Sequence, residues 1–151
     1  MDICLGCEIV TGKITTPGGV IYEDEYWMLT HSTSPKLPPL KGMLILQPKR
    51  HCTQLADLTW GECENLGLIL RDTCKAIETI LHPSKIYAGS FGEGVKHVHF
   101  MIVPRMQGMP IGAELLKEVI QDQLWTCSLN DASDIAMKVR KQLLSRKAEG
   151  G

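Results

Sequence analysis

Two histidines, His97 and His99, stand two positions apart in an apolar stretch that reads His-Val-His-Phe-Met-Ile-Val. Imidazole is neutral and nucleophilic near pH 7, so it can attack phosphorus without a separate base. Such a pair can also bind a metal, or its spacing can be a coincidence. The turn Gly92-Glu93-Gly94 comes shortly before it, and the backbone N–H groups of Gly92 and Gly94 can hold an anion against the imidazoles. The surroundings therefore favour a functional pair.

A second set of residues has the chemistry of a metal site. Cys4 and Cys7 form a Cys-x-x-Cys pair around Gly6, and His51 and His97 can complete a Cys₂His₂ set. Thiolate and imidazole are ligands that tetrahedral zinc favours. A redox Cys-x-x-Cys should follow a strand, and only three residues precede Cys4. The pattern predicts structural zinc, with two free thiols and a surface histidine as the alternative.

The composition describes one folded domain. The chain has 151 residues, 44% of them hydrophobic and 22% charged, and a formal net charge of −1. A chain of this length buries about two-thirds of its unfolded surface. The nearly neutral charge argues against a nucleic-acid polymer as partner. We find no apolar run near the roughly 20 residues that span a bilayer and no secretory signal. We therefore expect no membrane association and a cytoplasmic location, where cysteines stay reduced.

The strands that would position these residues follow from short apolar runs and turn signals. We expect a hairpin around Glu23-Asp24-Glu25 and further strands at 42–47, 85–91 and 97–103, the last ending at Pro104. Successive side chains of a strand point to opposite faces. Val98, Phe100 and Ile102 should then face the core, with His97 and His99 side by side on the other face, about 7 Å apart.

Helical periodicity marks three segments. The longest is 58–81, with Thr59 as its N-cap and Pro83 after its end. Two C-terminal segments, at 112–125 and 131–146, are also helical in pattern, and Ser128 or Asn130 can cap the second. The proline-rich stretch 32–39 should be a loop. We therefore predict an α+β fold, with an antiparallel sheet, one long helix and C-terminal helices.

At His97-Val98-His99-Phe100-Met101-Ile102-Val103 the chain resembles the histidine-triad (HIT) family, whose motif is His-φ-His-φ-His-φ-φ, where φ is a hydrophobic residue. The resemblance extends through most of the chain. It includes the N-terminal Cys-x-x-Cys, the hairpin, the strand end Gln47-Pro48-Lys49-Arg50-His51 and a closing amphipathic helix. It implies a single HIT-like domain over 1–151, with a helical part from about 106 to 151.

The resemblance also implies an activity. In the family the middle histidine, here His99, attacks the α-phosphate of a nucleotide such as a dinucleoside polyphosphate or a nucleoside phosphoramidate. The nucleotidyl-histidine is then hydrolysed or passed to an acceptor. Zinc-bearing members and the related uridylyltransferases are similar at Cys4, Cys7, His51 and His97. Members usually pair as homodimers.

Three departures from the family pattern stand out. The third motif histidine is Met101, which cannot donate a hydrogen bond, and a serine common before the motif is Gly94. An acidic residue that often holds the ribose is missing around His31. We assign Gly92, Gly94, Met101 and Arg105 to phosphate or substrate binding, although Arg105 fits an exposed ion pair equally well. The departures permit an alternative to an enzyme, a catalytically weakened nucleotide-binding or scaffolding protein. A nucleotidyl transferase with a phosphorylated acceptor is a third interpretation.

Overall fold

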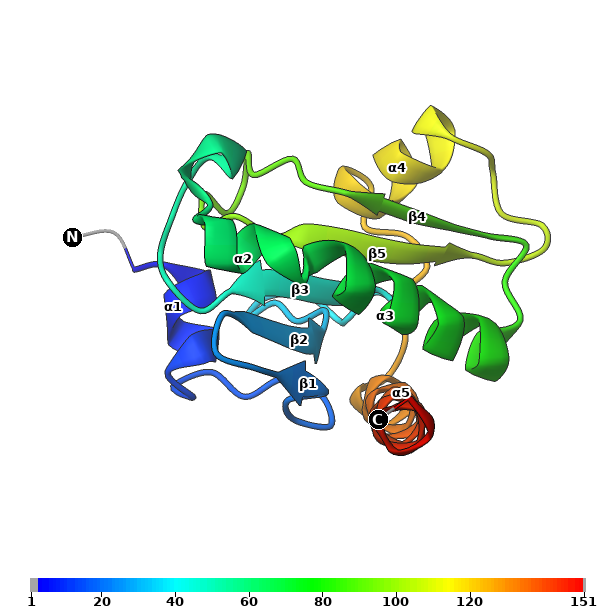
Figure 1. Ribbon diagram of the computed structural model, residues 1–151. Coiled ribbons are helices and arrows are strands. Elements are labelled where there is room, and N and C mark those ends of the chain that lie inside the picture. The colour runs from blue at the N-terminus through cyan, green and yellow to red at the C-terminus, as the bar shows by residue number, and fades with distance from the viewer. Residues whose placement is uncertain (1–2, 151) are drawn as a thin grey trace.

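The computed structural model describes residues 3–150 and contains one five-stranded sheet flanked by helices (Figure 1). All neighbouring strands are antiparallel, in the order β1-β2-β3-β5-β4. The α+β prediction is confirmed. The elements in chain order are α1 (Leu5–Val10), β1 (Tyr22–Glu23), β2 (Trp27–His31), β3 (Leu44–Pro48), η1 (Leu55–Asp57), α2 (Trp60–Glu64), α3 (Leu66–Leu81), β4 (Lys85–Gly89), β5 (Phe100–Arg105), α4 (Ala113–Ile120) and α5 (Leu129–Glu149).

The predicted hairpin is present. Tyr22 pairs with Leu29, and the turn is built on Asp24, whose carboxylate accepts the backbone N–H groups of Tyr26 and Trp27 at 2.8 and 2.7 Å. An aspartate that bonds the backbone two residues ahead is a common way of closing a turn. Burial raises the pKa of Asp24, but these bonds outweigh it and the net pKa is lowered.

The strand expected at 97–103 is displaced toward the C-terminus. It occupies Phe100–Arg105, so His97 and His99 lie just before it and Pro104 lies inside it. β3 pairs with β5 only as far as Ile102, while Pro104 pairs with Ile86 on the β4 side alone. A proline is tolerated where one side of a strand has no partner. The expectation that Pro104 ends the strand was therefore wrong.

The helices also differ from the prediction at their ends. The expected helix 58–81 is two helices, α2 and α3, that meet at Asn65, and Thr59 caps the first as predicted. The segment 112–125 is helical only as α4, because Gln123 and Trp125 adopt positive φ angles of 52° and 66°. Ser128, rather than Asn130, caps α5.

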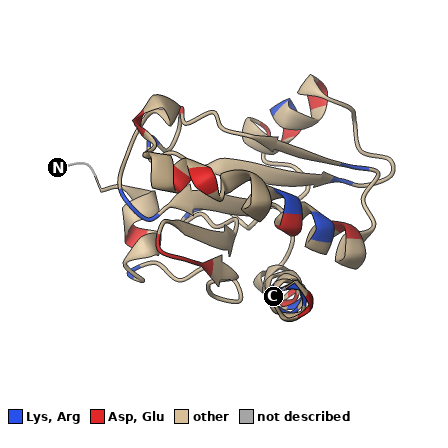
Figure 2. Ribbon diagram, in the orientation of Figure 1, with Lys and Arg blue, Asp and Glu red and all other residues tan. Residues whose placement is uncertain are grey.

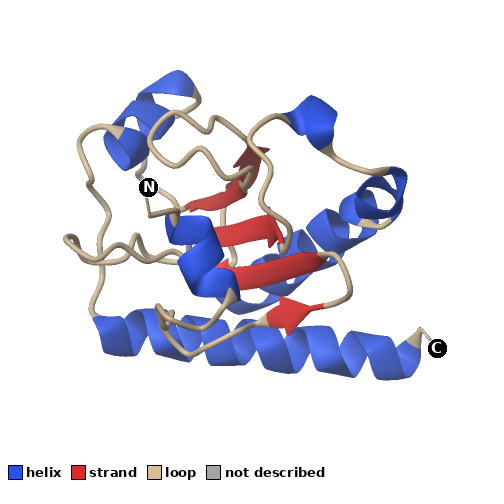
Figure 3. Ribbon diagram, turned by 90° about the vertical axis from the view of Figure 1, so that its left-hand side faces the viewer, coloured by secondary structure: helices blue, strands red, loops and turns tan. Residues whose placement is uncertain are grey.

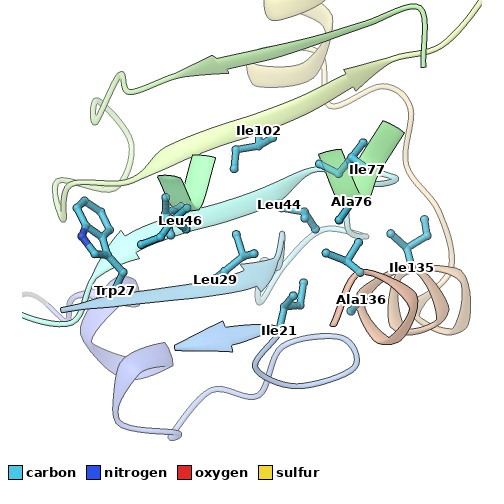
Figure 4. Packing of buried hydrophobic residues seen from close by; sticks show 12 residues of the cluster. Ile21, Trp27, Leu29, Leu44, Leu46, Ala76, Ile77, Ile102, Ile135 and Ala136 are labelled. Atoms are coloured by element: carbon cyan, nitrogen blue, oxygen red, sulfur yellow. The ribbon is translucent and has the colours of Figure 1, made fainter. Parts of the chain in front are cut away.

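The main core lies between one face of the sheet and the helices α3 and α5 (Figures 3 and 4). Ile102 of β5 is fully buried there with Ala76 and Ile77 of α3. Phe100 also packs against this cluster, and Val98 is buried. The predicted alternation is confirmed within β5, where Phe100 and Ile102 face this core; Val98 and the equally buried His97 lie before the strand.

A second apolar cluster covers part of the opposite face. Met101 and Val103 of β5 pack with Leu115 and Val119 of α4, and Leu40, directly after the proline-rich stretch, joins them. Helices thus lie on both faces of the sheet (Figure 3). Within residues 3–150 no helix is both long and apolar enough to cross a bilayer.

Candidate metal centre and active site

The two cysteines lie at the start of α1, against the end of β3. Cys4 is the N-cap of α1, and its Sγ accepts the backbone N–H of Cys7 at 3.5 Å. Gln47 at the end of β3 donates its side-chain amide to the carbonyl of Gly6 at 2.9 Å. This bond holds the Cys-x-x-Cys segment against the sheet.

Gly6 is needed for a close approach. A Cβ at this position would lie 2.6 Å from Cγ and 2.7 Å from Nδ1 of the His97 ring. The absence of a side chain at Gly6 therefore makes room for the imidazole of His97.

Four ligand atoms converge here. Cys4 Sγ lies 3.5 Å from His97 Nδ1, and Cys7 Sγ lies 3.3 Å from His51 Nδ1 and 3.6 Å from His97 Nδ1. All four atoms lie within 4.8 Å of one another. Sulfur and nitrogen ligands on a tetrahedral zinc are spaced about 3.5 Å apart. The structure therefore brings the four residues predicted from sequence together in an arrangement that suits a metal ion.

The His97 ring is oriented for this role. It is buried, and its Nε2–H donates to the carbonyl of Pro48 at 2.8 Å. Burial lowers the pKa of His97 and so favours the neutral ring, in which Nδ1 keeps its lone pair. A backbone acceptor that sets the tautomer of a ligating histidine is usual around metals. A bound metal would join α1, the segment after β3 and the segment before β5.

His99 is oriented in the opposite sense. Its Nδ1–H donates to the carbonyl of His97 at 2.8 Å, so that in the neutral tautomer the lone pair is on Nε2. His99 lines a cleft of about 550 Å³ together with Met101, Gly92 and Gly94. The free nitrogen is thus available as a nucleophile to an anion held by the Gly-rich turn.

Arg105 is not part of this cleft. It pairs with Lys85 at the far end of β5, where Figure 2 shows basic segments on both strands. Arg105 lies six residues beyond His99, and six residues of extended chain span about 20 Å. The assignment of Arg105 to phosphate binding is therefore not supported. Lys49 and Arg50 are also engaged elsewhere, because Lys49 pairs with Glu23 and Arg50 with the buried Glu62.

Sequence reasoning missed two walls of the cleft. One is the segment after β2, including Ser32 and Leu37, and the other is formed by Val119 and Ile120 of α4. The amphipathic pattern of 112–125 indicated that one face of this helix is buried, but not which part of the sheet the helix packs against.

His31 stands near the position of the missing acidic residue. It is fully buried, and its Nδ1–H donates to the carbonyl of Ser32 at 3.1 Å, while its Nε2 accepts the N–H of Gly42 at 3.2 Å. Burial lowers its pKa. His31 therefore contributes a neutral ring that cannot provide a charge for the ligand.

Comparisons with known proteins agree with this geometry. The HIT domain family model matches residues 14–108. An uncharacterized HIT-like protein of Methanocaldococcus jannaschii is 27% identical over 110 residues, which cover 70% of this chain and 81% of that protein. A zinc-bound histidine-triad protein of Mycobacterium smegmatis has a similar structure, with a TM-score of 0.71, 20% identity and coverage of 97% and 96%.

Plasmodium falciparum diadenosine triphosphate hydrolase is also similar in fold, with a TM-score of 0.64, 16% identity and coverage of 88% of this chain and 80% of that chain. The family match spans more than half of the chain and includes His51, His97 and His99. With its sheet, its paired histidines and its Cys₂His₂ cluster, this chain belongs to the HIT domain family.

Proposed function

We propose that this protein binds a nucleotide in the His99 cleft and hydrolyses or transfers it at the α-phosphate through a nucleotidyl-histidine. The observation that carries the proposal is the orientation of His99. Its Nδ1–H donates to the carbonyl of His97, so in the neutral ring the lone pair is on Nε2. His99 lines the cleft together with the Gly-rich turn. The diadenosine triphosphate hydrolase of similar fold supports the same class of chemistry.

The bond changes follow from this orientation. His99 Nε2 bonds to phosphorus while the bond to the leaving group breaks, and the leaving group takes that electron pair. The proton on Nδ1 stays in its bond to His97 throughout. Water or another acceptor then attacks phosphorus and the electron pair returns to Nε2. Met101 has no proton to give, so any proton for the leaving group comes from solvent.

We also propose that the metal held by Cys4, Cys7, His51 and His97 is zinc and that its role is structural. All four positions are filled by protein ligands, as in structural zinc sites, whereas catalytic sites keep one position open. The zinc-bound relative of similar fold supports this assignment. Zinc here would cross-link the segments that carry the four ligands, and His99 would be the nucleophile.

A homodimer is the third part of the proposal. β4 lies at an edge of the sheet and pairs only with β5 among the described strands. An unpaired strand edge can accept a second chain. Light scattering coupled to gel filtration should find twice the monomer mass, and a monomer at micromolar concentration would contradict this part.

The test of the nucleophile compares His99→Ala with His97→Ala. Protein incubated with a panel of adenylated substrates should gain the mass of an adenylyl group, and peptide mapping should place it on His99. His99→Ala should lose the adduct but keep its metal and its melting temperature. His97→Ala should lose the metal and melt at a lower temperature, because it removes a buried ligand.

The outcomes separate the candidate functions. An adduct on another residue, or an adduct that persists in His99→Ala, would overturn the mechanism. Nucleotide binding without any adduct would favour the nucleotide-binding or scaffolding alternative.

A further inference from the structure

A separate cavity lies on the face of the sheet opposite the His99 cleft, and we call it the α3–α5 cavity. The two helices come together in the main core at Ala76 and Ala136 (Figure 4). Beyond this contact they leave a space of about 650 Å³ between the first half of α3, the last turns of α5 and β1. Among the residues that the structure describes, none lines both this cavity and the His99 cleft. Small-molecule sites have volumes of about 300–1,000 Å³, so the cavity is large enough for a ligand of its own.

The floor of the α3–α5 cavity is apolar except for one hydroxyl group. Ile69 and Thr73 of α3 are buried there, and Leu143 of α5 packs against the main core beside them. The Oγ1 atom of Thr73 is buried and has no hydrogen-bond partner within residues 3–150. Buried polar groups in folded proteins are nearly always paired. The unpaired hydroxyl therefore marks a place for a polar atom of a ligand.

The rim of the cavity carries more positive than negative charge. Its charged side chains are those of Arg71, Asp72, Arg146, Lys147 and Glu149. Two guanidinium groups share one carboxylate, because Asp72 Oδ1 lies 2.7 Å from Arg71 Nη1 and 3.6 Å from Arg146 Nη1. The Nζ of Lys147 lies 4.8 Å from the centre of the Tyr22 ring. Three cations against two carboxylates leave one positive charge in excess, which suits a ligand with a single negative charge.

The mouth of the cavity is partly hydrocarbon. Leu68 of α3 lines it and is 59% exposed, whereas the side chain of Arg146 is only 27% exposed. An exposed apolar side chain at the mouth of a cavity indicates contact with an apolar ligand. Together with the charge at the rim, it favours a ligand that is apolar along its length and anionic at one end.

We propose that the α3–α5 cavity binds a small amphipathic carboxylic acid. Its carboxylate pairs with Arg146 and Lys147 at the rim, where positive charge is in excess. A phosphate monoester fits less well, since it carries nearly two negative charges at pH 7. The apolar body lies against Leu68, and a hydroxyl or carbonyl oxygen at its far end pairs with Thr73 Oγ1. The ligand bridges α3, α5 and β1, and it is distinct from the substrate of the His99 cleft.

Calorimetric titration of the full chain with decanoate, decanol and decylamine tests the charge. Decanoate should bind once per chain, and the other two should bind at least about tenfold more weakly, because they lose hydrogen bonds between charged groups. Arg146→Gln should weaken decanoate binding by about tenfold. The control Lys141→Gln, at an exposed cation of α5 outside the cavity, should leave it unchanged. Equal binding of decanol, or equal effects of the two substitutions, would overturn the proposal.

Amide NMR spectra locate the bound acid. Decanoate should shift the amide signals of Thr73 and Lys147 and leave that of Ile120, which lines the His99 cleft, in place. His99→Ala should bind decanoate as tightly as the parent does, because the two cavities share no lining residue. Shifts confined to the His99 cleft, or loss of decanoate binding in His99→Ala, would show that the acid occupies the cleft instead.

Thr73→Val tests the buried hydroxyl. The substitution should not lower the melting temperature, since it removes no hydrogen bond within the described chain. Decanoate, octanoate and hexanoate are each compared with their ω-hydroxy derivatives, so that one length reaches the floor. At that length the affinity ratio of the hydroxy acid to its parent acid should be about two- to tenfold higher for the unmodified protein than for Thr73→Val. An unchanged ratio at all three lengths would overturn the assigned contact and with it the proposal.

Discussion

The side chains of His97 and His99 are oriented differently because they donate hydrogen bonds from different ring nitrogens. His97 donates from Nε2 to Pro48 and turns Nδ1 toward the two cysteines. His99 donates from Nδ1 to His97 and leaves Nε2 toward the cleft. The backbone carbonyl of one histidine thus fixes the tautomer of the other. A displacement of His97 would therefore also change the orientation of His99, the proposed nucleophile.

Gly6→Ala tests how closely α1 must approach His97. The new Cβ would lie within 2.8 Å of three atoms of the buried ring, and overpacking of this kind costs about 1–3 kcal/mol. We expect a lower melting temperature and reduced metal content by elemental analysis. Gly67→Ala is the matched control, because Gly67 is also helical but has nothing near its added Cβ. Equal effects of the two substitutions would contradict the steric explanation.

Met101→His tests the missing donor. Met101 is only 9% exposed and packs against α4, so an imidazole there buries polar atoms without assured partners, at a cost of about 1–3 kcal/mol. We expect a lower melting temperature together with a faster turnover of a nucleoside phosphoramidate, by about tenfold or more. A dinucleoside polyphosphate should gain less, since its phosphate leaving group departs as an anion without a proton. Equal gains for both substrates would show that proton donation is not what Met101 lacks.

At the scale of the elements, the start of α2 supports His51 of the Cys₂His₂ cluster. The side chain of Glu62, 3% exposed, pairs with Arg50 through contacts of 3.0 and 2.9 Å and accepts the N–H of the N-cap Thr59. The carbonyl of Glu62 also accepts the indole N–H of Trp27 at 2.7 Å. Arg50 directly precedes His51, so this network joins α2, β2 and the ligand segment.

Glu62→Gln tests the charge in this network. The hydrogen bonds from Arg50 lower the pKa of Glu62 below its usual 4.5. A carboxylate with a lowered pKa stabilises the fold above its unfolded-state pKa, and this contribution is lost as the pH falls through the folded-state pKa. The variant should melt a few degrees lower at pH 7, and the difference should shrink below pH 4.5.

Asp134→Asn is the control for this experiment, because Asp134 forms an exposed ion pair with Lys138, and such pairs contribute little. Thermal melts of both variants across pH 3–7 provide the measurement. A Glu62→Gln variant as stable as the parent at every pH would show that the pair is dispensable.

At the scale of the whole molecule, the Cys₂His₂ cluster joins parts of the chain that are far apart in sequence. Its ligands come from α1, from the segment after β3 and from the segment before β5. The cluster thereby ties the N-terminal helix to the sheet end that carries His99. Two layers of helices complete the molecule, and the cleft lies under the layer formed by α4.

Metal removal should therefore weaken the whole fold. At a metal concentration of 100 times Kd, binding contributes about 2.7 kcal/mol, which corresponds to a drop of roughly 5–10 °C in melting temperature after chelation. Cys4→Ala should reproduce the drop and lose the metal. Cys63→Ala, at an exposed cysteine outside the cluster, should do neither. Protein purified without chelator that contains no metal would contradict this prediction.

Local sequence patterns were sufficient to predict much of the fold and the candidate metal ligands. Alternation along 97–103 correctly placed Phe100 and Ile102 in the main core, because the two faces of an extended segment follow from backbone geometry alone. Ligand chemistry likewise identified all four residues of the metal cluster. Thr59 was predicted as a cap from its residue type, since a hydroxyl before a helical pattern satisfies the first free N–H groups.

Only the tertiary structure decided the rest, because it depends on which segments meet. Pro104 is tolerated in β5 because β3 pairs with β5 only as far as Ile102. The sequence of β5 alone does not show where its neighbour β3 ends. Arg105 lies inside β5 rather than after it, because that strand begins and ends later than its apolar pattern indicated. The apolar wall of the cleft likewise required α4 to fold back over the sheet, where Ile120 joins Leu37 and Phe91 from segments far apart in the chain.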